Sequence, residues 1–282
     1  MISRRRFMQG LGTGAACLAG AGLVDGLFIE PSRLVVERIE AKLLRLPPAL
    51  DGLKIAQLSD FHYKSSLDGE LIWRAVDLAN QLAPDMIVLT GDYVDAFARP
   101  HPGRNATPCA QILGCLKAHL GVFGILGNHD DCDPKFVGRA LERQGVALLR
   151  NRSVFVERSG VRLWIAGVED VLAGSARLEE ALRPIPPGEV TVLLAHEPDY
   201  ADTVKEFPVD LQLSGHSHGG QIRVPFAGPI YLPPMARKYP SGLRQLGRLS
   251  LYTNRGLGTT FFHARFDATP EVTLTTLRSV IR

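Results

Sequence analysis

Residues 55–62 read IAQLSDFH, a mostly apolar run that ends in two side chains able to bind metal, Asp60 and His62. Short apolar runs bounded by turn residues are typical of buried strands. The same arrangement occurs four more times. The polar cluster is GD (91–92) after residues 87–90, GNHD (127–130) after 122–126, H (196) after 192–195, and GHSH (215–218) after 211–214. Because ligands gather beyond the carboxyl ends of strands in α/β sheets, we expect the five clusters to converge on one site.

The chemistry of these clusters indicates a metal centre. Their side chains offer nitrogen and oxygen donors without sulfur, which suits Mn, Fe, Zn or similar ions. Asp92 could bridge two ions, and two ions about 3.5–4 Å apart can clamp a phosphoryl group. Helix capping by Asp60 and Asp92, or a turn at Asn128, would leave the histidines beside them unexplained. We expect the glycines at 91, 127 and 215 to let the backbone turn sharply.

The rest of the chain predicts an α/β fold with two packed sheets, because strands alternate with helices at first and then outnumber them. We expect helices at 67–82, 109–120 and 134–144. Strands are expected at 34–44, 54–58, 86–90, 122–126, 154–157, 161–167, 191–195, 211–214, 251–254 and 272–277. The long loops 99–108 and 225–242 are of a length that is often functional or mobile.

The order of the clusters resembles the calcineurin-like metallophosphoesterase superfamily, whose pattern is DxH, GD, GNH(D/E), H and GHxH. All five blocks occur in order over residues 60–218, and the resemblance covers the chain after residue 28. LSDFH (58–62) and the GGQ that follows the last histidine are similar to a bacterial branch of secreted or membrane-associated phosphodiesterases, which includes the YaeI-like and YkuE-like proteins. The resemblance implies a four-layer α/β/β/α sandwich, with two mixed sheets flanked by helices and the metal site at the carboxyl ends of strands.

The resemblance also implies a role for each residue of the site. One ion would be held by Asp60, His62, Asp92 and His218, and the other by Asp92, Asn128, His196 and His216. His129 would act near the leaving group as an electrophile or general acid, oriented by Asp95, while Asp130 shapes its loop. A metal-bridging hydroxide would attack phosphorus directly, without a covalent phospho-enzyme.

The N-terminus has the layout of an export signal. Arginines 4–6 are followed by an uncharged, apolar stretch at 11–24, and Ala19-Gly20-Ala21 offers small residues for cleavage. The run SRRRFM (3–8) resembles a twin-arginine signal. We therefore predict a signal or N-terminal anchor at 1–28, a single domain at 29–282, and a location in the periplasm or cell envelope. A disordered basic tail and lipidation at Cys17 are the alternatives.

The net charge and the length of the chain limit which partners and roles are expected. The net charge of +3 does not indicate a nucleic-acid surface, which also disfavours a nuclease. A chain of 282 residues can bury a core without metal, so a metal here is expected to be functional. Cys109 and Cys115 could pair in an oxidising compartment, although free cysteines are favoured. We expect a monomer that hydrolyses a small phosphate ester or a lipid-linked one.

Four alternatives stay open. The fold could be a metal-binding scaffold without catalysis, although every position is filled. It could cleave a UDP-diacylglucosamine-type pyrophosphate if the domain faces the cytoplasm. Asn254 and Arg255 could touch substrate or form a turn with Gly256. Four aromatic side chains could either form an apolar rim for a lipid or pack in the core, and core packing is favoured. They are Phe226, Tyr231, Phe261 and Phe262.

Overall fold

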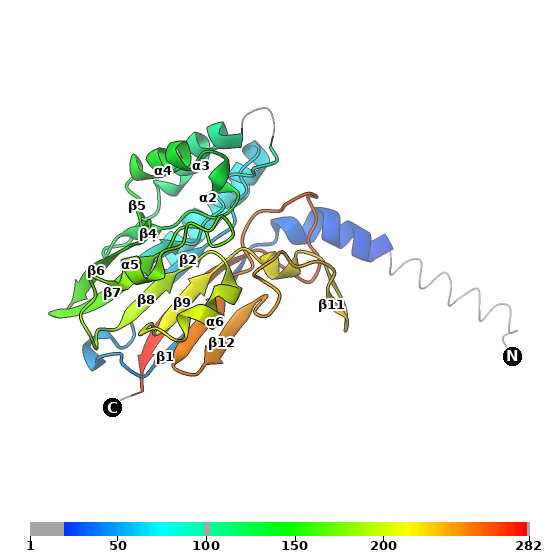
Figure 1. Cartoon of the computed structure of the whole chain (residues 1–282). Coiled ribbons are helices and arrows are strands. Elements are labelled where there is room, and N and C mark those ends of the chain that lie inside the picture. The colour runs from blue at the N-terminus through cyan, green and yellow to red at the C-terminus, as the bar shows by residue number, and fades with distance from the viewer. Residues whose placement is uncertain (1–19, 99–101, 281–282) are drawn as a thin grey trace, which may run out of the picture.

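Two six-stranded sheets form the centre of the structure, a computed structural model that describes residues 20–98 and 102–280 (Figure 1). The first sheet has the order β1-β14-β2-β3-β4-β5 and the second β12-β13-β9-β8-β7-β6. The first comprises β1 (Val35–Leu43), β2 (Lys54–Leu58), β3 (Met86–Leu89), β4 (Val122–Gly124), β5 (Ala147–Leu148) and β14 (Glu271–Ser279). The second comprises β6 (Arg152–Arg158), β7 (Val161–Gly167), β8 (Thr191–Leu194), β9 (Leu211–Ser214), β12 (Gly242–Leu246) and β13 (Leu249–Thr253). A separate hairpin joins β10 (Arg223–Val224) to β11 (Gly228–Pro229).

Alternation of side chains along the strands explains the layering. In β3, Met86 and Val88 belong to the core between the two sheets, whereas Ile87 and Leu89 belong to the core beneath the helices. Successive residues of a strand point to opposite faces, and a strand that is apolar throughout must be covered on both. The short continuous apolar runs of the sequence are therefore central strands of a layered fold.

Helices cover the outer face of each sheet. α2 (Ser66–Gln81), α3 (Ala106–Leu113) and α4 (Pro134–Glu142) share a hydrophobic core with the first sheet. α5 (Leu178–Leu182) and α6 (Ala201–Val204) share another with the second sheet. Side-chain caps explain where helices start, since Asp133 accepts a hydrogen bond from the Phe136 amide at 3.1 Å at the start of α4. The predicted four-layer α/β/β/α sandwich is confirmed.

Several boundaries differ from those expected. The helix predicted at 109–120 runs from Ala106 to Leu113. After the C-cap residue Gly114, the amides of Cys115 and Leu116 donate only three residues back, to the carbonyls of Ile112 and Leu113, and the α-helix ends. β4 ends at Gly124 instead of residue 126. β5, β12, α5 and α6 were not anticipated, because elements of two to five residues carry almost no periodicity. The predicted loop 225–242 contains β11.

The N-terminal segment (residues 20–32) lies against the loop 257–268 (Figure 1). Residues 20–24 are helical and continue into the short helices η1 (Asp25–Ile29) and η2 (Glu30–Ser32). The buried Glu30 carboxylate accepts hydrogen bonds from the amides of Asp267 at 2.9 Å and Ala268 at 2.6 Å. The Arg265 amide donates to the Gly26 carbonyl at 2.9 Å. Arginines 4–6 of the predicted signal lie outside the described residues.

Two further findings concern the described residues only. Over 20–98 and 102–280, no helix combines the length and the apolar character needed to cross a membrane. Cys109, Cys115 and Cys132 are all free, and Cys109 is buried in the core under α3.

Candidate metal centre

The five polar clusters meet at one edge of the molecule. β2, β3 and β4 are parallel, with Leu58 opposite Leu89 and Leu89 opposite Gly124, so the loops that follow them leave the sheet side by side. β8 and β9 of the second sheet are also parallel. The two sheets are joined at this edge, since the Asp60 carboxylate accepts a hydrogen bond from the His216 amide at 3.0 Å.

The backbone is strained at this edge. Five residues of the clusters have positive φ angles: Asp60 (53°), His62 (43°), Asp92 (58°), His216 (69°) and His218 (51°). Residues other than glycine rarely adopt this conformation, which costs on the order of 1–3 kcal/mol each and collects at functional sites. Local propensity does not produce such a concentration, so the surrounding structure holds these side chains in place.

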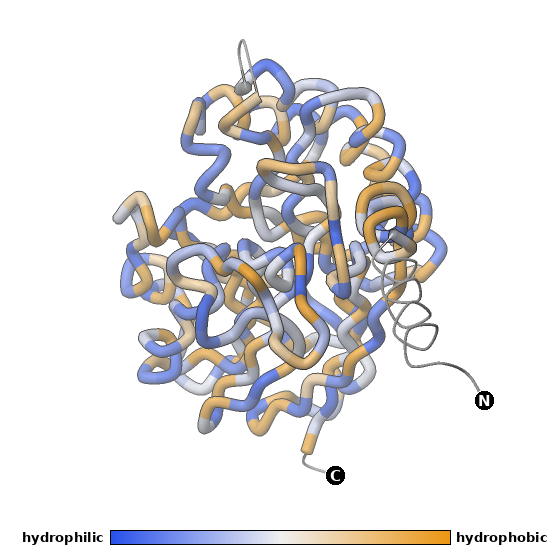
Figure 2. The backbone as a smooth tube through the Cα atoms, turned by 90° about the vertical axis from the view of Figure 1, so that its right-hand side faces the viewer, coloured by the Kyte–Doolittle hydropathy of each residue, from blue (hydrophilic) through white to orange (hydrophobic). Residues whose placement is uncertain are grey.

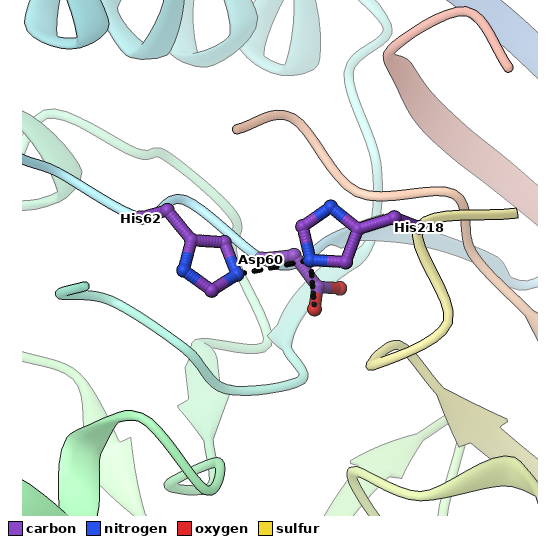
Figure 3. Close-up of side chains that lie close together, drawn as sticks. All are labelled: Asp60, His62 and His218. Carbon is purple, nitrogen blue, oxygen red and sulfur yellow. Dashed lines mark hydrogen bonds and ion pairs between the residues drawn. The ribbon is translucent and has the colours of Figure 1, made fainter. Parts of the chain in front are cut away.

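The first group of facing ligand atoms contains Asp60, His62 and His218 (Figure 3). The Nε2 atoms of His62 and His218 lie 3.0 Å apart, and Nε2 of His218 is 3.5 Å from Oδ1 of Asp60. Burial lowers the pKa of both histidines well below the usual value, so two neutral rings face each other. Both Nδ1 atoms are buried without a hydrogen-bond partner. A cation among these three side chains would use the facing atoms as ligands.

The second group contains Asp92, His196 and His216. Nδ1 of His196 lies 2.6 Å from the Thr90 carbonyl, so it carries a proton, and Nε2 is the ring nitrogen that faces Oδ2 of Asp92 at 3.1 Å. Nε2 of His216 faces the Pro234 carbonyl at 2.9 Å, which leaves Nδ1 as its ligand atom. Burial opposes a positive charge on His196, but the Asp92 carboxylate outweighs it and raises the pKa of His196, and the same field would attract a metal ion.

Asp92 lies between the two groups. Its Oδ2 atom is 3.1 Å from Nε2 of His196 in one group and 3.5 Å from Nε2 of His62 in the other. Asn128 and Asp92 line one cavity, and the Oδ1 atom of Asn128 is buried without a hydrogen-bond partner. Unpartnered buried acceptors are costly, so a cation here would satisfy atoms that the protein leaves bare. The residues present therefore fit bound metal, with Asp92 where a shared ligand would lie.

His129 lies beside this cavity, facing Asp95. Nδ1 of His129 is 3.6 Å from Oδ1 of Asp95, which is long for a hydrogen bond, and it accepts one from the Ala96 amide at 3.1 Å. Burial opposes a charge on His129, but the Asp92 carboxylate and then Asp95 outweigh it and raise its pKa. Burial also opposes the charge of Asp95, but the His129 imidazole and the Phe97 amide outweigh it, so the pKa of Asp95 is lowered. His62, Asp95 and His129 form a third group of facing ligand atoms.

Asp130 connects the loops that follow β3 and β4. Its fully buried carboxylate accepts hydrogen bonds from the amides of Asp92 (2.9 Å), Tyr93 (2.8 Å) and Gly127 (2.9 Å). Burial, followed by the charge of Asp92, raises the pKa of Asp130 to about 7. This carboxylate therefore shapes the loop that carries Asn128, as the resemblance implied.

The glycines of the clusters act differently from the prediction. Gly91 does turn the chain, with a φ of 100°. Gly127 and Gly215 do not have positive φ, and the prediction of a sharp turn is wrong for them. They are required because their neighbours approach closely: a Cβ on Gly127 would clash with Oδ1 of Asp92, and one on Gly215 with Oδ2 of Asp60.

The prediction that the four aromatic side chains pack in the core is wrong. Phe261 and Phe262 are 70% and 72% exposed, Tyr231 is 59% exposed, and Phe226 is fully exposed at the tip of the β10–β11 hairpin. Tyr231, Phe261 and Phe262 line a cavity of about 650 Å³ that also contains Asp92 and the three histidines His129, His216 and His218. The metal groups therefore lie at the base of a cavity with apolar walls.

Asn254 and Arg255 serve the fold. The Asn254 side chain accepts from the Gly256 amide at 2.7 Å and donates to Thr273 at 2.8 Å, so the turn interpretation holds. Arg255 lies 2.6 Å from the buried Glu271 carboxylate. Neither residue lines the cavity, as far as the described residues show.

Sequence reasoning missed three contributors to the site. The Thr90 and Pro234 carbonyls fix which ring nitrogen of His196 and His216 is free, but backbone groups leave no mark in a sequence. The third is Lys64, whose Nζ is 3.4 Å from Oδ2 of Asp95. Lys64 follows His62 by two residues, but this spacing places side chains on one face only in a strand, and His62, with a φ of 43°, lies outside any strand.

Comparison with known proteins agrees with this geometry. The family model for calcineurin-like phosphoesterases matches residues 53–220. The chain is 35% identical to the uncharacterized metallophosphoesterase YkuE of Bacillus subtilis, over 99% of this chain and 98% of that protein. It is 32% identical to phosphodiesterase YaeI of Escherichia coli, over 97% and 98%. The chain belongs to the calcineurin-like phosphoesterase family.

Two more distant likenesses were found. The UDP-2,3-diacylglucosamine pyrophosphatase LpxG of Chlamydia muridarum is 28% identical over 86% of this chain and 89% of that protein. The crystal structure of a dimetal phosphatase from Danio rerio superposes with a TM-score of 0.50 at 13% identity, over 81% of this chain and 93% of that one. The latter likeness concerns the fold alone.

Proposed function

We propose that this protein is a dinuclear metal-dependent hydrolase of phosphoric esters, with phosphodiesters as its preferred substrates. The observation that carries the proposal is the place of Asp92, whose Oδ2 atom faces His62 at 3.5 Å and His196 at 3.1 Å. A carboxylate between two groups of imidazoles is suited to hold two ions at once. The relative named phosphodiesterase YaeI, which matches along almost its whole length, supports the choice of diesters.

The ligands divide into two sets. One ion is assigned to Asp60, His62, Asp92 and His218, and the other to Asp92, Asn128, His196 and His216. Mn, Fe and Zn suit these nitrogen and oxygen donors. When bound, the ions supply an activated hydroxide nucleophile and neutralise charge on the phosphoryl oxygens.

His129 is assigned the role of proton donor to the oxygen of the leaving group. The Ala96 amide and the Asp95 carboxylate both face Nδ1, so Nε2 is the nitrogen left for the substrate, and the imidazolium form of the ring would donate its proton from there. Asp95 faces Nδ1 and holds the orientation of the ring, while Lys64 faces Asp95 from the opposite side at 3.4 Å. Protonation of the leaving oxygen by a positioned imidazole contributes about 10²–10⁴ in rate.

Two other functions remain candidates. The likeness to LpxG and the apolar walls of the cavity favour a pyrophosphate of a diacylated sugar nucleotide as a second substrate, if the domain faces the cytoplasm. A scaffold without catalysis would keep the fold and lose a ligand or His129. Every one of those positions is filled here.

The cellular setting is also a proposal. Residues 1–28 would act as a twin-arginine export signal or remain as an anchor, and residues 29–282 would form one domain in the periplasm or cell envelope. The protein would act as a monomer, without nucleic acid, on a small or lipid-linked phosphate ester.

The test is hydrolysis by the metal-reconstituted protein. Full-length protein would be loaded separately with Mn, Fe, Zn or Ni and assayed on bis-p-nitrophenyl phosphate and p-nitrophenyl phosphate. We expect at least one metal to support hydrolysis, with the diester preferred. Hydrolysis of neither ester with any metal would overturn the proposed function.

A further inference from the structure

Exposed apolar side chains gather around the mouth of the cavity. Among the described residues, 19 large hydrophobic side chains are exposed. Five of them lie in residues 23–29, and Val224 and Phe226 lie on the β10–β11 hairpin. Six line the cavity itself: Phe97, Leu172, Ile230, Tyr231, Phe261 and Phe262. We call these thirteen side chains the apolar rim. Single exposed apolar residues need no explanation, but a group of them in and beside a polar site indicates a binding surface.

The apolar rim is built and held by polar contacts. Gln221 donates from Nε2 to the Thr260 carbonyl at 3.0 Å and accepts from the Thr260 amide at 2.9 Å, so it ties the β10–β11 hairpin to the loop 257–268. The Arg223 amide also donates to the Phe266 carbonyl at 2.9 Å. Glu30 ties the N-terminal segment to the same loop. Figure 1 shows the N-terminal helix beside this loop, on the side of the molecule that carries β11, and Figure 2 shows that side facing the viewer, with apolar residues in orange.

Two aromatic residues of the rim are costly to the fold. Phe226 has a φ of 67° and Phe261 a φ of 58°, and their side chains are fully and 70% exposed. A bulky residue with positive φ is an outlier that costs on the order of 1–3 kcal/mol. An exposed ring does not recover this cost by burial, so these two residues do not serve stability. Their exposed rings are therefore free to contact a ligand or a surface outside the protein.

We propose that the apolar rim rests in the interfacial layer of a lipid bilayer, and that the cavity takes the phosphodiester of an amphiphile whose acyl part remains in that layer. This deepens the proposed function and rests on it. Aromatic and aliphatic side chains that surround a polar site match a surface where headgroups meet acyl chains. The sequence that leads into this face is uncharged over residues 11–24, which fits the same partner.

The reaction on such a substrate balances without a further reactant. Water adds its oxygen to phosphorus, and the bond from phosphorus to the leaving oxygen breaks. That oxygen leaves with a proton, which His129 is placed to donate. One proton of the water stays on the new phosphate oxygen, and the other passes to solvent, from which His129 is reprotonated. The lipid phosphomonoester stays in the bilayer when the leaving group is the water-soluble part.

The test compares two esters that share one leaving group. Bis-p-nitrophenyl phosphate is soluble, whereas dioleoylphosphatidyl-p-nitrophenol can be embedded in phosphatidylcholine vesicles. Full-length protein would be assayed on both as wild type, as the double variant Phe28→Ser/Phe226→Ser and as Leu44→Ser. Neither Phe28 nor Phe226 lines the cavity. Leu44 is 52% exposed and follows β1, which runs antiparallel to β2, so it lies at the opposite edge of the sheet.

We expect the ratio of kcat/KM on the embedded ester to that on the soluble ester to fall about tenfold or more in the double variant, because each lost phenyl group removes apolar area from the bilayer. Leu44→Ser should leave the ratio unchanged. An equal ratio in all three proteins would overturn the proposal, as would a change of oligomeric state that accounts for the loss.

Failure of the proposed function is distinguishable. If no protein hydrolyses either ester, flotation of the metal-free proteins with phosphatidylcholine vesicles decides the docking surface alone. Residues 1–19 are the same in all three proteins, so a difference in flotation reports the rim. Loss of flotation in the double variant supports the surface, and equal flotation overturns it.

Discussion

Oδ2 of Asp92 lies 3.1 Å from Nε2 of His196, and the other nitrogen of that ring is bound to the Thr90 carbonyl. With the Nδ1 proton directed to Thr90, Nε2 faces a carboxylate oxygen, and the space between these two atoms is suited to a cation, which either a proton or a metal ion can supply. Replacement of Asp92 should affect both groups of ligands, because the same oxygen faces His62 at 3.5 Å.

We expect Asp92→Ala to weaken the binding of both ions by more than about 100-fold, beyond what removal of a residue that only orients a ligand costs. Metal content after dialysis, measured by mass spectrometry of the folded protein, checks this. Asp131→Ala, at an exposed position of the next loop, is the matched control and should retain its metal. Retention of one tightly bound ion in Asp92→Ala would show that Asp92 is not shared.

His129→Ala should keep its metal and lose activity in proportion to how poor the leaving group is. Phenol, with a pKa of about 10, needs a proton when it leaves, so phenyl phosphodiesters should lose about 10²–10⁴ in kcat. Bis-p-nitrophenyl phosphate, with a better leaving group, should lose less. Loss of metal equal to that in Asp92→Ala would show that His129 is a ligand.

Gly127→Ala should reduce metal binding without a change in any ligand. The added methyl group would clash with Oδ1 of Asp92 and lie 2.8 Å from Cε1 of His196, so these side chains must move. Gly138→Ala is the control, because its Cβ would meet only Cδ1 of Leu148 at 3.3 Å, and leucine can shift. Titration of the metal-free variants with Mn would compare the two, and equal affinities would contradict the role of the close approach.

Asp130→Asn should destabilise the metal-free protein. The amide side chain keeps only one accepting oxygen, so it can serve either the amides of Asp92 and Gly127, which share Oδ2, or the amide of Tyr93 on Oδ1. The buried amides on the other side lose their acceptor, at a cost of about 1–3 kcal/mol in the free energy of unfolding. Asp131→Asn, at the adjacent exposed position, should change it by less than about 0.5 kcal/mol. Denaturant titration measures both, and equal midpoints would mean that the loop does not need the carboxylate.

Glu30→Ala should release the N-terminal segment. The change leaves the amides of Asp267 and Ala268 without their acceptor, and the segment loses its main polar attachment. Limited proteolysis should then cut between residues 20 and 34 faster than in wild type, while Asp25→Ala should behave as wild type. Unchanged cleavage would show that the apolar contacts of the segment hold it without Glu30.

The sequence was enough to predict the layers and the convergence of the clusters. Buried strands such as β3 are apolar throughout, and each is followed directly by polar residues. The same short stretch of sequence therefore predicts both the strand and the ligands at its end. The helix ending at Leu113 was predicted too long, because apolar residues continue past Gly114 at helical spacing although the chain has already turned.

Other features depend on tertiary structure and left no local signal. The ring nitrogens of His196 and His216 are selected by the carbonyls of Thr90 and Pro234, which are distant in the chain. Phe261 and Phe262 are as apolar as any core residue, and only the path of the loop 257–268 leaves them exposed. The need for glycine at 127 and 215 comes from side chains of other loops.

The attachment of Glu30 has a consequence for maturation. A signal peptidase that cut within Ala19-Gly20-Ala21 would leave Leu23, Phe28 and Ile29 on the mature chain, because they follow the cut, and Glu30 would hold this segment on the loop 257–268. The processed protein would then keep these apolar side chains near its new amino terminus, beside the loop that lines the cavity. If residues 1–28 act as an export signal, a protein released by cleavage would therefore still carry the part of the apolar rim that we propose contacts the bilayer.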